Sequence, residues 1–583
     1  MADPIARRIT GFPPPAPDAP KRNPPVLARD EIEALIAEGR HVFILHDQVI
    51  KADGWMKYHP GGDLAIRHMV GKDASDEVDA QRCADSVPQH GSYHSLETRQ
   101  QMLRYRIGRI EGGWINFVPP FQGGVFRTRA EIEADSQKIK PPVDRPSSVT
   151  ASISDQEETQ ELRNRSSPKI SPSEQVEKGA PVAEPLDGMS YLDTITHEYT
   201  TLDLEKYPSP DHLTQAKVAA KYRELHNRVY NEGLYDCNYW TSYGVECCRY
   251  SLFLLCMSLA FYFKWYYTAA FWLGVLWHQL GFVVHDASHI SITHSFQFDS
   301  VLAILVANFL GGLSAGWWKW SHNVHHIVTN APEHDPDIEH LPIFAVSHRL
   351  LSNLRSTYHN RVMRYDAIAK VLLRVQAWTY YPILALARFN LFFLSWEYLL
   401  SGRGPKKGPA GWFRHLELFG LLFFCFWFGY GILYTLLPDL KTRLLFTLIA
   451  NVVASPLHLQ IVQSHFAMST MDLGPDESFP QRQLRTTMDI DCPEWLDFFH
   501  GGLQFQVIHH LFPRVPRHNL RTTQKLVQEF CNEVGIPYAL YGFAGGNKKV
   551  IGRLAEVSRQ AAILAKCQQS IVENGNWSGV NMH

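Results

Sequence analysis

Four long apolar runs constrain the fold more than any other feature of this 583-residue chain. A helix that crosses a bilayer needs about 20 mostly apolar residues, because lipid leaves backbone polar groups no other partners. The runs form two pairs with short loops inside each pair, residues 250–263 with 267–284 and residues 416–437 with 444–462. We therefore expect a mainly α-helical chain anchored in a membrane by two helical hairpins.

The loop between the two hairpins indicates how the chain is oriented in the membrane. Between Leu400 and Leu416 it carries four basic side chains, Arg403, Lys406, Lys407 and Arg414. Short cytosolic loops are enriched in Lys and Arg, so this loop and both chain termini are predicted to be cytosolic. Two other apolar stretches, 301–318 and 371–400, are interrupted by glycines or arginines, and we expect them to be interfacial or partly buried.

Three histidine clusters lie close to the predicted helix ends. They read HDASH at 285–289, HNVHH at 322–326 and QVIHH at 506–510. Spacings of three and four residues place side chains on one face of a helix, and the topology puts all three clusters on the same side of the membrane. The predicted metal ligands are His285, His289, His322, His325, His326, Gln506, His509 and His510.

The number and type of these ligands indicate which metal they hold. Imidazole suits iron, copper, zinc and nickel, and this many ligands exceeds the needs of one ion, so two metals are expected. Zinc has no redox chemistry, whereas two irons would be able to activate O2. His458 or His465 could supply one more ligand, and His465 lies nearer the cytosolic end. The side chains expected to orient the imidazole rings are Asp286, Asn323, Asp335 and Asp337.

Composition excludes several other classes of protein. A net charge of −2 does not fit a strongly electrostatic nucleic-acid binder, and nine cysteines without a C-x-x-C pair argue against a disulfide scaffold or a thiolate zinc site. The stretch 138–187 is rich in Ser, Pro, Glu and Lys, which is typical of disorder. We expect a disordered start (1–25), a small α+β domain (26–112), a largely disordered linker (113–187), a membrane domain with a cytosolic helical cap (188–545), and a C-terminal helix and tail (546–583).

The N-terminal domain contains His59-Pro60-Gly61-Gly62, preceded by Asp53-Gly54-Trp55 and followed by Val70-Gly71-Lys72-Asp73-Ala74. Together these motifs resemble the haem-binding core of cytochrome b5. The resemblance implies a haem b held by two histidines, of which His59 is the first. In that family the second histidine lies about two dozen residues after the first, where this chain has Arg82-Cys83-Ala84 and no histidine. If Gln81–Ser92 is an insertion, His94 takes the family's position, so it is the expected second ligand and His90 is the alternative. His68 has the wrong spacing and is expected at the surface.

The histidine clusters, in this order and beside hydrophobic hairpins, resemble the three histidine boxes of membrane fatty-acyl desaturases and hydroxylases over residues 241–542. The glutamine that opens the third box is similar to the front-end subgroup, and Ser288 stands where the family usually has glycine. The resemblance implies a non-haem di-iron centre that uses O2 to remove two hydrogens from a lipid chain. With the haem domain and the segment 114–120, the chain looks most like fungal sphingolipid desaturases.

These resemblances imply a delta-8 desaturase of the long-chain base of ceramides or glucosylceramide precursors. A front-end delta-5 or delta-6 fatty acyl desaturase, a lipid hydroxylase, and a membrane-anchored haem electron carrier without enzyme activity are the alternatives. The sequence has no dinucleotide fingerprint, so electrons from NADH are expected to arrive through a separate NADH-cytochrome b5 reductase. The linker would let the tethered haem domain reach the iron centre. The expected location is the endoplasmic reticulum membrane, with the active site facing the cytosol.

Overall fold

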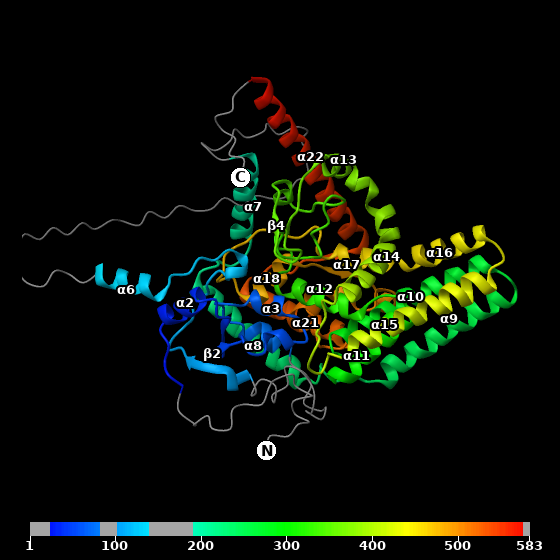
Figure 1. The fold of residues 1–583 in the computed structure, drawn as a ribbon, viewed down its shortest axis with the longest axis horizontal. Coiled ribbons are helices and arrows are strands. Elements are labelled where there is room, and N and C mark those ends of the chain that lie inside the picture. The colour runs from blue at the N-terminus through cyan, green and yellow to red at the C-terminus, as the bar shows by residue number, and fades with distance from the viewer. Residues whose placement is uncertain (1–23, 82–101, 139–189, 575–583) are drawn as a thin grey trace, which may run out of the picture.

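The computed structural model describes residues 24–81, 102–138 and 190–574, and these are mostly helical (Figure 1). The N-terminal domain contains an antiparallel sheet of β1 (Val42–Leu45), β2 (Gln48–Lys51) and β3 (Arg106–Arg109). Its helices are α2 (Arg29–Ala37), α3 (Asp63–Arg67) and α4 (Ser75–Ala80). Strand β1 is buried throughout, because its side chains contribute to apolar clusters on both faces of the sheet. The predicted small α+β domain is therefore present.

The stretch that follows this domain is packed rather than free. Trp114 Nε1 donates to the Gly71 carbonyl at 3.1 Å, and Arg127 pairs with the Glu33 carboxylate at 2.7 Å before helix α6 (Arg129–Lys138). Residues 113–128 therefore cover the domain, although their sequence is that of a linker. The remainder of the expected linker, 139–187, and the expected disordered residues 1–23 lie outside the described residues.

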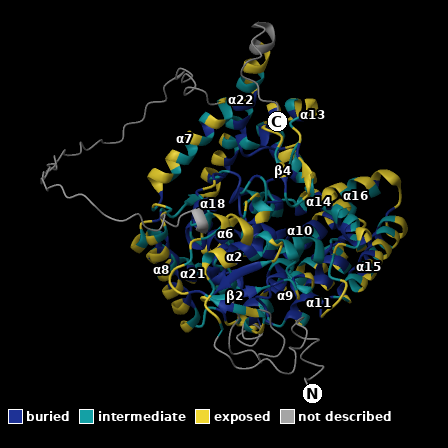
Figure 2. Cartoon of the chain, turned by 60° about the vertical axis from the view of Figure 1, so that its left-hand side comes forward, coloured by how far each residue is buried: buried dark blue, intermediate teal, exposed yellow. Residues whose placement is uncertain are grey.

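Four helical segments match the predicted hairpins. They are Trp240–Tyr262 (η4 and α9), Tyr266–Ser288 (α10), Phe413–Leu436 (α15 and η8) and Leu440–Gln463 (α16 and α17). Each is long and apolar enough to cross a membrane. Helix α10 packs against both α9 and α16 (Figure 1). Large apolar side chains such as Leu252 and Leu255 are exposed, and Figure 2 shows exposed residues along α16 as well. An apolar outer face is what a lipid environment requires.

A fifth segment, Ala367–Ser401 (α13, η7 and α14), is also long and apolar enough to span a membrane. In the sequence, Arg388 argues against such a span. In the structure this side chain is 4% exposed and donates to the Gly311 carbonyl at 2.6 Å, so its charge faces protein and not lipid. The other interrupted stretch forms a pair of helical segments, Phe296–Leu310 (α11 and η5) and Ala315–Ile327 (α12), that bend by 120°.

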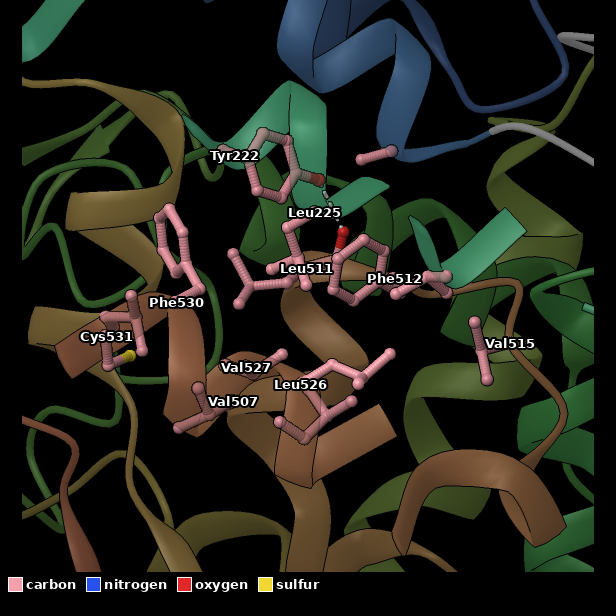
Figure 3. Close-up of a cluster of buried hydrophobic side chains, with 14 of the residues drawn as sticks. Tyr222, Leu225, Val507, Leu511, Phe512, Val515, Leu526, Val527, Phe530 and Cys531 are labelled. Atoms are coloured by element: carbon pink, nitrogen blue, oxygen red, sulfur yellow. Dashed lines mark hydrogen bonds between the residues drawn. The ribbon is translucent and has the colours of Figure 1, made fainter. Parts of the chain in front are cut away.

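The helical cap is built from segments that come before and after the membrane helices. Helices α8 (His212–Asn231), α20 (Gln506–Leu511) and α21 (Leu520–Val534) share one apolar cluster. In that cluster the Tyr222 ring stacks on Phe512 and its hydroxyl donates to the Leu511 carbonyl at 2.8 Å (Figure 3). The third histidine box is therefore carried on a helix whose other side is fixed in a core.

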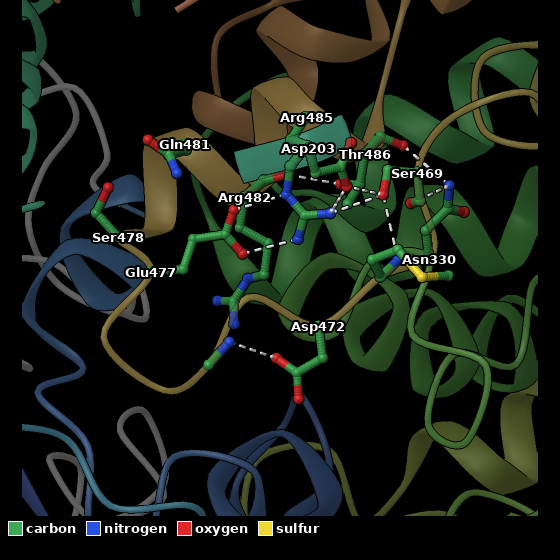
Figure 4. A network of polar contacts seen from close by, with 12 residues as sticks. Asp203, Asn330, Ser469, Asp472, Glu477, Ser478, Gln481, Arg482, Arg485 and Thr486 are labelled. Carbon is green, nitrogen blue, oxygen red and sulfur yellow. Dashed lines mark hydrogen bonds and ion pairs between the residues drawn. The ribbon is translucent and has the colours of Figure 1, made fainter. Parts of the chain in front are cut away.

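A buried ion network holds the chain leading to that box. The Arg485 guanidinium, 2% exposed, pairs with Glu477 at 2.7 Å and Asp203 at 3.0 Å (Figure 4). This ties α18 (Phe479–Thr486) to α7 (Tyr191–Lys206). The predicted C-terminal helix is present as α22 (Phe543–Asn574), longer than expected, and packs against α14 and α17.

Candidate metal centre

The fold brings the three histidine boxes together. The first box lies at the end of α10, the second on α12 and the third on α20, while His465 follows directly after α17. Seven of these histidines form two groups in which all ligand atoms lie within 4.8 Å of one another: His285, His289, His322 and His509 in the first, and His325, His465 and His510 in the second. Two groups of imidazoles match the expectation of two metal ions.

His326 lies between the two groups. Its Nε2 atom is 3.1 Å from the Nε2 atoms of both His322 and His509, and its ring stacks on that of His510 at 4.3 Å. Every one of the seven box histidines is therefore close to one of the two groups. His326 therefore lies within reach of both groups, and its Nε2 would be able to bind a metal held by either one.

In the part of the chain that the structure describes, several of the histidine nitrogens are unpartnered and neutral, as metal binding requires. His285 Nε2, His289 Nε2 and His510 Nε2 are buried and have no hydrogen-bond partner among the described residues. A buried ring nitrogen without a partner is costly, and coordination would satisfy it. Burial, followed by the effect of neighbouring histidines, holds the pKa of His509 and of His510 well below the ordinary value. The neutral imidazole is the form that ligates metals, so these residues fit the expected ions.

Carboxylates lie close to several of the rings. Asp335, which is fully buried, lies 2.8 Å from His325 Nδ1, while Asp337 lies 3.9 Å from His322 Nδ1. Asp286 is 3.6 Å from His285 Nδ1. Only Asp335 is within hydrogen-bond distance of a ring, and the Asp286 carboxylate instead accepts from the Tyr243 hydroxyl at 2.6 Å and pairs with Arg517 at 3.1 Å. The expectation that Asn323 orients a ring is wrong, because its amide donates to the Gly61 carbonyl of the haem domain at 3.3 Å.

One orienting residue has no signal in the sequence. Gln483 Oε1 lies 2.9 Å from His510 Nδ1, and its amide nitrogen donates to the His326 carbonyl at 2.9 Å. It therefore connects the second box with the third. A glutamine in a short helix that is distant in sequence from both boxes carries no motif, and only the tertiary structure identifies it.

Replacing Asp335 by asparagine is expected to weaken metal binding by about ten- to a hundredfold, because the neutral amide no longer strengthens the His325 ligand. The measurement is the metal retained per chain after a graded chelator challenge. Asp439→Asn is the matched control, since Asp439 caps α16 away from the centre and asparagine caps helices equally well. Equal retention in Asp335→Asn and the wild-type chain would contradict this role.

The remaining candidate ligands differ in their surroundings. Gln506 is buried at the start of α20, one helical turn before His509 and His510. His458 belongs to neither histidine group, whereas His465 belongs to the second, so His465 is the better candidate of that pair. His278, on α10, also belongs to neither group, since it lies 3.3 Å from Gln460 and its ring stacks on Phe499.

The haem site of the N-terminal domain opens toward these histidines. One cavity is lined by His59 and by apolar side chains of the domain, including Trp55, Ile66 and Met69, and also by His289 and His326. The apolar wall and a histidine whose Nδ1 donates to the Gly62 carbonyl at 2.9 Å fit a haem with His59 as axial ligand. His94 and its alternative His90 lie outside the described residues.

The expectation that His68 lies at the surface is wrong. Its side chain is 1% exposed, its Nδ1 accepts a hydrogen bond from Gln122 at 3.1 Å, and Phe121 packs edge-on against its ring. The residues that cover it belong to the stretch that is expected, from its sequence, to be linker. Because that stretch folds back onto the domain, His68 becomes buried.

Polar contacts hold the haem domain on the membrane domain. Ion pairs join Asp76 to Arg223 at 2.6 Å and Glu77 to Arg482 at 3.2 Å. Asn116 adds another contact, since its backbone N–H donates to the Asp476 carboxylate at 2.9 Å. The structure therefore shows the tethered domain docked with its haem cavity against the histidine centre, which is the position that electron delivery requires.

Comparisons with known proteins agree with both sites. Residues 263–542 match the family model described as fatty acid desaturase, and residues 28–111 match that of the cytochrome b5-like haem/steroid binding domain. The chain is 52% identical to the Delta 8-(E)-sphingolipid desaturase of Emericella nidulans, over 95% of this chain and 98% of the relative. For the protein of the same name from Komagataella phaffii the identity is 46%, over 96% and 98%.

A plant relative is more distant. The Delta(8)-fatty-acid desaturase 2 of Arabidopsis thaliana is 34% identical over 65% of this chain and 84% of its own length. The matches to the fungal relatives cover the haem domain, the histidine boxes and the membrane helices together. The chain belongs to the fatty acid desaturase family, as a multi-pass membrane oxidoreductase with a fused cytochrome b5-like domain.

Proposed function

We propose that this chain is a sphingolipid delta-8 desaturase, which inserts an E double bond at the eighth carbon of the long-chain base of ceramides or glucosylceramide precursors. One observation carries the proposal: eight histidines converge into a two-part centre directly beside a haem cavity. The names of the relatives that match this chain over almost its full length support the substrate and the position.

The two non-haem irons would supply the O2-dependent oxidation of two neighbouring methylene groups, and the chain's own residues position the lipid. An apolar cavity of about 110 Å³ borders His285 and is lined by side chains such as Trp277, Leu280 and Leu457. A saturated chain has no polar group near its middle, so only its placement decides which carbon loses hydrogen. This cavity is suited to hold the reacting part of the chain beside the metal ligands.

A haem held by His59 would supply electrons one at a time, and the docked domain places its cavity beside His289 and His326. The reaction requires two electrons for each O2 from a reductant, so a one-electron carrier would have to be supplied with electrons twice. We propose a separate NADH-cytochrome b5 reductase as their source, and the endoplasmic reticulum membrane as the location, with the termini and both redox sites on the cytosolic face.

Expression in a yeast that lacks sphingolipid unsaturation tests this function. Lipid mass spectrometry is expected to show a loss of two mass units in the long-chain base, with the double bond at the eighth carbon. A change confined to fatty acid methyl esters would instead indicate an acyl desaturase, and a gain of one oxygen a hydroxylase. If the haem is reduced and reoxidised but no lipid changes, the chain would be an electron carrier without enzyme activity.

A further inference from the structure

A second cavity lies where the haem domain meets the membrane domain. It has a volume of about 470 Å³, and we call it the interdomain cavity. It is bordered by the turn around His59, by helices α11, α12 and α15, and by the basic loop 403–407. Ser288, which precedes the metal-group residue His289, lines both this cavity and the haem cavity. The interdomain cavity therefore adjoins the metal centre at the cytosolic ends of α10 and α15.

Glu417 is a buried carboxylate in the wall of this cavity. It is 3% exposed and accepts hydrogen bonds from Ser314 Oγ at 2.5 Å, from Gly316 N–H at 3.0 Å and from Asn308 Nδ2 at 3.4 Å. All three of these bonds go to Oε2. The carboxylate is thus held in one orientation, with Oε1 left as an acceptor. A buried carboxylate is costly unless hydrogen bonds satisfy it, and here they satisfy Oε2.

Two buried hydroxyls line the same cavity without partners. Ser288 and Ser300 are 4% and 7% exposed, and neither Oγ atom has a hydrogen-bond partner among the described residues. Buried hydroxyls are normally paired, so each of them is suited to a ligand that can donate or accept. The rest of the wall includes apolar side chains, among them Phe296 and Phe413. The cavity thus combines an apolar surface with one fixed acceptor, two hydroxyls and basic side chains, among them Lys319, whose buried Nζ has no hydrogen-bond partner among the described residues.

We propose that the interdomain cavity binds the polar head of the long-chain-base lipid, with Glu417 Oε1 accepting a hydrogen bond from a head hydroxyl. This inference rests on the proposed function. A ceramide head carries two hydroxyls and an amide but no charge, which matches an acceptor beside two hydroxyl groups.

The position of Glu417 also links the head to the reacting carbon. Ser314, which donates to Glu417, lines the apolar cavity beside His285. A head fixed at Glu417 would therefore direct the chain toward the metal centre from a constant starting point. A fixed distance between the bound head and the metal centre would make the enzyme act at one carbon regardless of chain length.

Glu417→Gln tests the assignment with little change in shape. The amide oxygen is expected to take the Oε2 position, because three donors point there, so that an NH2 group replaces the acceptor Oε1. With purified holoenzyme, kcat/KM for ceramide is expected to fall by about ten- to a hundredfold, the loss of one hydrogen bond to a charged group. The haem spectrum and metal content should not change. Glu556→Gln is the matched control. Glu556 lies on α22, where its carboxylate accepts a hydrogen bond from the Tyr199 hydroxyl, and this variant should keep wild-type kinetics.

Ceramide analogues that lack the C1 or the C3 hydroxyl make the test specific. The wild-type chain should discriminate against at least one of them, and Glu417→Gln should lose that discrimination. If Glu417→Gln does not accumulate, Ser300→Ala should show a smaller loss on the same substrates. Equal use of ceramide and both analogues by the wild-type chain would overturn the proposal, as would unchanged kinetics in Glu417→Gln.

Two further outcomes have separate meanings. Lys57, Lys406 and Lys407 also border the cavity, so vesicles containing phosphatidic acid are tested as competitors. Competition by these vesicles but not by neutral lipid vesicles would show that the cavity takes an anionic head, and the proposal would be wrong. A wild-type chain that desaturates acyl lipids and no ceramide would refute the proposed function itself, whatever the variants do.

Discussion

Replacing His326 by alanine lowers desaturated product by about a thousandfold or more, the scale expected when one member of a cooperating catalytic unit is removed. The reason is its position between the two histidine groups, where its Nε2 is 3.1 Å from both His322 and His509. We therefore expect this variant to bind less of both metals, and not of one alone. The measurement is product formation per haem, with metal content determined on the same sample.

The haem domain serves as the internal control for this variant. Its Soret band should remain that of the wild-type chain, because His59 is held within its own domain by the Gly62 carbonyl. His197→Ala, at an exposed position on α7, should retain full activity. Substantial product from His326→Ala would show that this histidine is not part of the centre.

Replacing His59 by alanine is expected to remove haem from the chain and abolish product that depends on NADH and the reductase, while the non-haem metal stays bound. His59 lies at the wall of an apolar cavity, and an alanine there leaves the porphyrin iron without a ligand on that side. Absorption spectra measure the haem content, and metal analysis measures the non-haem metal that stays bound. The opposite pattern to His326→Ala is thus expected, with haem lost and histidine-bound metal kept.

His46→Asn is the control within the same domain. His46 has a positive φ of 47°, which asparagine tolerates, and its side chain is half exposed. This variant should bind haem and form product normally. If the His59→Ala chain kept its Soret band, His59 would not be a haem ligand. If it lost haem but still formed product from NADH, electrons would reach the metal centre without passing through this domain.

The metal ligands can be predicted from the sequence because their signals are local. Spacings of three and four residues on helices, next to apolar runs of known length, are enough to place His285, His322 and His509 on one side of the membrane. The rings of these three residues lie side by side in the folded chain. For His465 the only signal is its position beyond the fourth helix, and it lies in the second group.

Features that depend on distant contacts cannot be predicted in this way. The buried Arg388 looks like a charge that prevents a span until its Gly311 partner is known. Gln483 and the Asn323 contact with Gly61 depend on how separate parts of the chain pack, which no spacing records. The sequence suggests an exposed His68 because the segment that buries it resembles a linker in composition. Tertiary packing overrides the local pattern at each of these positions.

Iron analysis of the purified, full-length chain tests the central claim most directly. The account predicts two irons per chain in addition to the haem iron, removed by the combined replacement of His326 and His510 without loss of the Soret band. The measurement compares total iron with haem determined by its absorption. If total iron only equals haem in a chain that still forms the desaturated lipid, the histidine groups do not hold two irons.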